Sequence, residues 1–117
     1  MTEPVRYCRL ALCFFIVGGC AFVNNGHSGA ATGANSSIVL SNGSVCLWNI
    51  LWGLEVAGHG YGEMDATCVS TQNGKGGTGA TDVVANGISF ISCIGAIITT
   101  VSPPFNTSGN SNSFILH

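Results

Sequence analysis

Three side chains that can bind a metal lie close together near the middle of the chain: His59, Glu63 and Asp65. Imidazole and carboxylate groups are ligands that zinc and manganese accept in proteins. Glycines alternate with these residues, and a glycine-rich backbone is too free to hold three ligands in a fixed geometry. We therefore predict a polar turn here and no metal site.

A glycine-rich stretch at residues 75–81 is similar to the phosphate loop of partitioning ATPases, in which backbone amides and lysines surround phosphate. Ala80 stands where the second lysine would be, and residues 82–90 predict a strand instead of a helix that starts at the phosphate. No Gly-x-Ser-x-Gly motif marks a nucleophilic serine. We therefore predict that the protein is not an enzyme and uses no cofactor.

The amino-terminal residues have the order of an export signal. Arg6 and Arg9 precede an apolar run at residues 10–17, and two glycines then lead to Cys20. A positive segment, an apolar segment and a small-residue cleavage site in this order are typical of a signal peptide. The ending Val-Gly-Gly-Cys resembles the bacterial lipobox. That resemblance implies a signal peptide at residues 1–19, a lipid on Cys20 and a membrane partner held through this lipid.

Three cysteines remain after Cys20, at positions 46, 68 and 93. An exported protein meets an oxidising compartment, where a pair of thiols forms a disulfide. Cys46 and Cys93 lie in the two most apolar segments, so neighbouring strands there would bring them together. The sequence predicts a Cys46–Cys93 disulfide, with buried free thiols as the alternative.

Composition sets the class of fold and excludes one class of partner. Charged residues make up 7% of the chain, against ~25% in a usual soluble domain. Lys75 is the single cation after Cys20, so we exclude nucleic acid as a partner. The sequence does not identify a protein partner for this chain. Apart from the signal peptide, we expect a flexible tether at 20–37, one small domain at 38–101 and a disordered tail at 102–117.

The first folded segment, residues 38–57, has the alternation of a half-buried strand, broken at a candidate hairpin turn, Asn42-Gly43. Its apolar face comprises Cys46, Trp48, Ile50, Trp52, Leu54 and Val56. Trp48 and Trp52 are candidate surface anchors for a partner, although paired tryptophans on one apolar face are more often part of the core.

The remaining elements complete the predicted fold. A short helix fits only at residues 63–72, before a glycine-rich loop. Residues 88–101 are rich in isoleucine and threonine and predict a strand that ends at Pro103-Pro104. We predict an α+β fold, with a small antiparallel sheet and one short helix.

A rival interpretation concerns residues 83–101, which carry no charge over a length that can cross a membrane as a helix. Apolar residues at 88, 91, 94, 98 and 101 would form one stripe of that helix. The alternative to the predicted fold is therefore a small integral membrane protein with this segment spanning the bilayer.

The motifs Gly-Ser-Val-Cys at 43–46, Asn-Ile-Leu at 49–51, Gly53-Leu54 and Ile94-Gly95 resemble the TRL-like family of small bacterial lipoproteins over about residues 41–101. Trp52 is an insertion relative to the family pattern, and its alanine-rich helix is largely missing. The resemblance implies a β-α-β-β arrangement without catalytic residues. We therefore expect a non-enzymatic envelope lipoprotein with a binding or structural surface, on the periplasmic face of the outer membrane or on the cell surface.

Overall fold

The protein is a parallel β-solenoid. The computed structural model describes residues 14–74, 81–99, 101–102 and 113–116, and these residues contain strands and no helix. In chain order the strands are β1 (Phe14–Gly18), β2 (Ala21–Val23), β3 (Ser28–Thr32), β4 (Ser37–Ser41), β5 (Val45–Leu47), β6 (Trp52–Val56), β7 (Tyr61–Met64), β8 (Val69–Thr71), β9 (Val83–Ala85), β10 (Phe90–Ser92), β11 (Ile97–Ile98), β12 (Val101–Ser102) and β13 (Phe114–Leu116).

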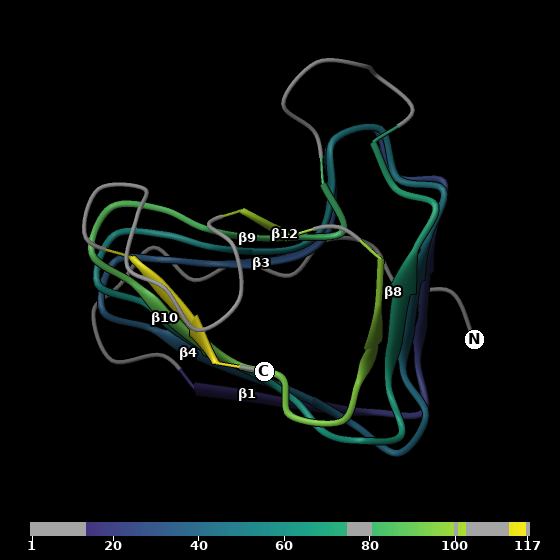
Figure 1. Cartoon of the computed structure of the whole chain (residues 1–117), viewed down its shortest axis with the longest axis horizontal. Helices are drawn as coiled ribbons and strands as arrows, with labels where there is room; N and C mark the ends of the chain where they lie inside the picture. The colour runs from purple at the N-terminus through teal and green to yellow at the C-terminus, as the bar shows by residue number, and fades with distance from the viewer. Residues whose placement is uncertain (1–13, 75–80, 100, 103–112, 117) are drawn as a thin grey trace.

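The strands form three sheets, and each turn of the coil adds one strand to each sheet in succession. Sheet A has the order β11-β8-β5-β2, sheet B the order β1-β4-β7-β10-β13, and sheet C the order β12-β9-β6-β3. In Figure 1 the strands of each sheet lie behind one another around a common interior. All pairings between turns are parallel, which a coil with one direction of winding requires.

A repeat of 24 residues sets the register. Ser37 pairs with Tyr61 in sheet B, Ala21 with Val45 in sheet A, and Ser28 with Trp52 in sheet C. Each turn therefore stacks on the next with equivalent positions in contact. The third turn is longer, because it also contains residues 75–80, which lie outside the described part.

Left-handed backbone conformations make the corners. Asn24, Trp48 and Gln72 have φ values of 58°, 55° and 55° at equivalent positions between sheets A and C. Asn42 and Gly43 lie between sheets B and A, and His59 lies between sheets C and B, all with positive φ. A positive φ bends a strand sharply, so the chain turns from one sheet into the next.

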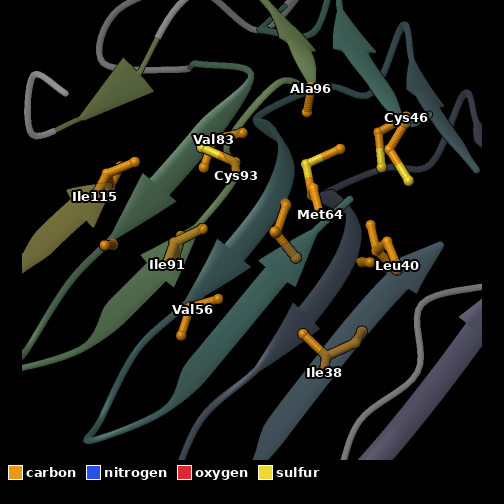
Figure 2. Close-up of a cluster of buried hydrophobic side chains, with 14 of the residues drawn as sticks. Ile38, Leu40, Cys46, Val56, Met64, Val83, Ile91, Cys93, Ala96 and Ile115 are labelled. Carbon is orange, nitrogen blue, oxygen red and sulfur yellow. The ribbon is translucent and has the colours of Figure 1, made fainter. Parts of the chain in front are cut away.

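The apolar core fills the space between the sheets (Figure 2). Ile38 and Leu40 from β4, Val56 from β6 and Met64 from β7 have at most 1% of their surface exposed. In sheet B, Leu40 pairs with Met64 and Ile91 with Ile115, so large apolar side chains stand one above the other in successive turns.

The predicted α+β fold is wrong. Residues 63–72 form the end of β7, a turn and β8, where a helix was expected. The sheets are parallel, and Asn42-Gly43 connects two sheets instead of closing a hairpin. Local patterns led to this error, because the pairing partner of each strand lies 18 to 29 residues away and leaves no trace in neighbouring residues.

The single strand predicted across residues 45–56 is also wrong. Trp48 has a positive φ and ends the run, so β5 and β6 belong to different sheets. Cys46 and Leu54 point into the core, whereas Trp48 and Ile50 are exposed, and the expected common apolar face does not exist.

Several segments contain strands where the sequence predicted a tether, a tail or an alternative membrane helix. Residues 20–37, expected as a tether, contain β2 and β3 with buried residues such as Phe22 and Ala30. Of the expected tail, Ser102 ends β12 and residues 114–116 form β13, while residues 103–112 lie outside the described part. Residues 83–99 hold β9, β10 and β11, and the described chain has no helix long and apolar enough to cross a membrane.

Candidate functional site: the tryptophan corner

The connection between sheets A and C projects beyond the three sheets (Figure 1). We call it the tryptophan corner, and it comprises residues 24–27, 48–51 and 72–74 from three successive turns. It begins with the left-handed residues Asn24, Trp48 and Gln72. Trp52 follows the middle segment directly as the first residue of β6. Both tryptophans of the chain therefore lie in or beside this corner.

A ladder of asparagines holds the corner from inside. Asn25, Asn49 and Asn73 are 24 residues apart, and each amide joins the next. The Asn25 side chain donates to the Oδ1 atom of Asn49 over 3.0 Å, and the Asn49 side chain donates to the Oδ1 atom of Asn73 over 2.7 Å. The backbone N–H groups of Asn25 and Asn49 donate to the same two oxygens. A buried amide is stable only when its polar atoms are bonded in this way.

The ladder ends on a carboxylate. Asp82 is 2% exposed, and its Oδ1 atom accepts hydrogen bonds from the backbone and the side chain of Asn73, both over 2.9 Å. Asp82 follows residues 75–80, so the long third turn returns to the ladder at this position. The returning chain thereby supplies the acceptor that a fourth asparagine would otherwise provide.

Two glycines make room for the ladder. A Cβ atom on Gly29 would lie 2.7 Å from the Asn49 Nδ2 atom, and one on Gly53 would lie 2.7 Å from the Asn73 Nδ2 atom and 2.5 Å from the Asp82 carbonyl oxygen. No side chain fits at such distances. Glycine is therefore required beside Asn49 and Asn73.

Trp48 is the most exposed large apolar residue of the corner. It is 45% exposed, and its indole N–H donates to the Oε1 atom of Gln72 over 2.6 Å. Ile50, two residues later, is 37% exposed. The surface of the corner thus combines these two apolar side chains with the exposed polar residues Asn24, His27 and Gln72.

A second group of polar atoms lies where the corner meets sheet C. The Ser28 hydroxyl donates to the Oε1 atom of Glu55 over 2.7 Å, so the Nδ1 atom of His27, 3.0 Å away, acts as donor to that hydroxyl. The rings of His27 and Trp52 meet edge to face at 5.3 Å. Ser28 is fully buried, and its only proton is given to a carboxylate, so it lacks the accessible oxygen of a nucleophile.

The predicted lipid site, Cys20, comes immediately before β2. Its side chain is partly buried against the core, and its backbone N–H donates to the Ser44 Oγ atom over 3.3 Å. Residues 14–18, the end of the predicted leader, form β1 and pair with β4. Signal cleavage and lipid attachment stay predictions.

Cys46 and Cys93, predicted to form a disulfide, are both buried and free in this structure. Burial raises the pKa of the Cys46 thiol to about 12, helped by the nearby Cys68 and Asp82. Burial also raises the pKa of Cys93 to about 11. The thiolate is the reactive form, so both groups are unreactive at neutral pH while the protein is folded.

The other chemistry-bearing residues of the sequence are dispersed. His59 lies in the corner between sheets C and B, Glu63 accepts a hydrogen bond from the Tyr61 hydroxyl, and Asp65 accepts one from the backbone N–H of Thr67, two residues later. Within the described ranges no three side chains of the metal-binding types come together. Lys75 and Ala80 of the glycine-rich stretch lie outside those ranges.

Sequence reasoning missed the ladder. The signal was available as three asparagines at a fixed spacing of 24, matched by Cys20, Ser44 and Cys68 at the same spacing. A repeat of this period indicates a solenoid. No protein-family model matches the chain, and neither the curated proteins nor the solved structures contain a match, so the resemblance to the TRL-like family stays a prediction.

Proposed function

We propose that this protein is a non-enzymatic lipoprotein of the bacterial cell envelope, held to a membrane through Cys20. In this proposal the solenoid is a rigid support that presents the tryptophan corner as a binding surface. The observation that carries it is the exposed Trp48, fixed by an internal ladder of hydrogen bonds. A large aromatic side chain on a rigid base gives a partner much contact area at a small loss of conformational entropy.

The contacts of Ser28 support a binding role over a catalytic one. Hydrolysis by a serine needs an exposed hydroxyl whose proton is taken by a histidine. Here the histidine donates to the serine, and the serine donates to Glu55. These contacts stabilise the start of sheet C beside Trp52 and prepare no nucleophile.

Metabolic labelling tests the lipid attachment. The full chain is expressed in a diderm bacterium with radiolabelled palmitate, together with Cys20→Ser and Cys46→Ala variants. We expect label in the parent chain and in Cys46→Ala, and none in Cys20→Ser. Label that persists after Cys20→Ser would contradict the proposal. Separation of the two membranes on a density gradient then tests the predicted outer-membrane location.

A further inference from the structure

Trp48 occupies a backbone conformation that disfavours it. The equivalent positions in the neighbouring turns hold Asn24 and Gln72, and all three have positive φ. Asparagine tolerates this conformation, but a bulky side chain with positive φ is strained. Ile88, which is 51% exposed, has a φ of 59° at the corner between sheets C and B, so the strain at Trp48 points to a role outside the fold only together with its surroundings.

Trp48 lies among apolar and uncharged polar residues, and His27 is the one titratable side chain of the corner. Ile50 is exposed beside it, Leu51 is partly exposed, and residues 24–27, 48–51 and 72–74 contain no Asp, Glu, Lys or Arg. A corner that projects from the molecule normally carries charge, because water surrounds it on several sides. This corner instead combines tryptophan and isoleucine with uncharged amides.

Several polar groups of the corner are bonded within the protein. The Trp48 indole N–H donates to Gln72, the backbone N–H of Ile50 donates to the Asn25 carbonyl oxygen, and that of Leu51 donates to the His27 carbonyl oxygen. The backbone N–H of Gly74 donates to the Asn49 carbonyl oxygen. These groups can leave water without losing a hydrogen bond, which entry into a lipid phase requires.

We propose that the tryptophan corner inserts into the interfacial region of a phospholipid bilayer, with Trp48 and Ile50 as the inserting side chains. Tryptophan favours the boundary between headgroups and acyl chains. The proposal deepens the proposed function by naming the membrane as the partner of the corner, and it rests on the chain working at a membrane.

The position of Cys20 agrees with this arrangement. Only β2 separates Cys20 from Asn24, where the corner begins, a distance of roughly 13 Å for an extended chain. A lipid on Cys20 would therefore bring the corner to the same bilayer. Two attachments together hold a protein far longer than one.

Fluorescence from single-tryptophan variants tests the proposal without the lipid. The full chain with Cys20→Ser and Trp52→Phe reports from Trp48 alone, and one with Cys20→Ser and Trp48→Phe reports from Trp52. Each is mixed with phosphatidylcholine vesicles whose acyl chains carry bromine at the boundary with the headgroups. We expect a blue shift and quenching of Trp48 emission, with a much smaller effect on Trp52.

A sedimentation assay with the same vesicles adds a matched control. Trp48→Asn, in the Cys20→Ser chain, should lower the vesicle partition coefficient about tenfold, because the interfacial tryptophan is lost. Ile94→Asn, a change at a second exposed apolar residue far along the chain, should leave it within twofold. An equal loss of vesicle partitioning in both variants would show that any exposed apolar residue contributes to binding, and this result would overturn the proposal.

Two further outcomes would also overturn it. Trp48 emission that brominated vesicles do not quench excludes insertion, and binding of Trp48 to soluble oligosaccharides without vesicle binding assigns the corner to a carbohydrate. Either result leaves the palmitate experiment on Cys20 intact, so failure of the corner is distinguishable from failure of the lipid anchor.

Discussion

Two corners of the same coil are stabilised by different means. Between sheets A and C the interior is polar, and each amide of the ladder makes several hydrogen bonds. Beside the corner between sheets B and A the interior is mainly apolar, and Leu40 in β4 pairs with Met64 in β7. The polar bonds of that corner are short local links: the Gly43 N–H donates to the Thr67 Oγ1 atom over 2.8 Å, and the buried Ser44 hydroxyl donates to the Ser41 carbonyl oxygen over 2.7 Å. A repeat of fixed length thus accepts either chemistry, provided that every turn repeats it.

The two corners should differ in how well they tolerate substitutions. Apolar contacts have no direction, so a side chain of similar volume can replace another at small cost. Hydrogen bonds have direction, and an unpaired buried partner costs free energy on both sides of the break. The ladder corner should therefore be more sensitive to substitution than the apolar corner.

Gly53→Ala should have the largest effect. The new methyl group would meet Ser70, the Asp82 carbonyl oxygen and the Asn73 amide, and the carbonyl cannot move away. We expect a loss of about 4 kcal/mol of unfolding free energy, or failure to fold. Gly26→Ala is the control, since nothing lies within 4 Å of its position. Urea denaturation followed by circular dichroism measures both, and similar losses would refute the role of Gly53.

Asn49→Leu and Leu40→Met compare the two corners directly. The first change keeps the branched shape of the side chain but leaves Asn25 and Asn73 without their bonds to Asn49, and should cost about 3 kcal/mol. The second conserves volume, and should cost less than about 1.5 kcal/mol. Unfolding free energies from urea titrations decide between them. Equal costs would mean that the ladder contributes no more than ordinary packing.

Alkaline pH should weaken the apolar interior through Cys46. Its pKa is raised from 9.0 to about 12 by burial, so the unfolded chain loses the proton above pH 9 while the folded chain keeps it. The contribution of Cys46 is complete below pH 9 and should fall by about 1.4 kcal/mol per pH unit from pH 9 to pH 12. Cys68 and Cys93, whose pKa values burial raises to about 11, add to the slope between pH 9 and pH 11. Thermal unfolding measured from pH 8 to pH 11 tests this. Cys46→Ala should remove about 1.4 kcal/mol per pH unit from that slope and leave the part of the other two thiols, and an unchanged slope would contradict the assignment to Cys46.

Trp48→Asn should have the smallest effect on stability, and of opposite sign. Asparagine fits the left-handed conformation, so the folded state should gain about 0.5 to 1 kcal/mol, less the lost bond to Gln72. Differential scanning calorimetry would show a slightly higher melting temperature. A marked fall would mean that Trp48 stabilises the fold and that its backbone conformation costs little.

The sequence allowed prediction of strands but not of their arrangement. Alternation located strand residues near Cys46 and Leu54 correctly, because inward and outward positions still alternate within each short strand. It failed at Trp48, where a tryptophan in a left-handed conformation gives no local sign of a corner. The parallel register and the ladder depend on residues 24 positions apart, which only a search for repeats would connect.

The candidate site was predicted in part and for the wrong reason. Trp48 and Trp52 were identified from an apolar face that the structure does not contain, yet both lie at the tryptophan corner. The buried amides beneath them were not predicted, since asparagine in a glycine-rich stretch is usually part of a solvated turn.

The peptide bond between Gly19 and Cys20 joins β1 to β2, and both of its residues are engaged in the fold: the Gly19 N–H donates to the Ser41 carbonyl oxygen and the Cys20 carbonyl oxygen accepts from Val45. A peptidase acting there would have to reach an extended chain before the coil closes. Export and cleavage would then have to be completed before the chain folds. The matured molecule would begin its first turn at β2, with the side of β4 that β1 had covered left open.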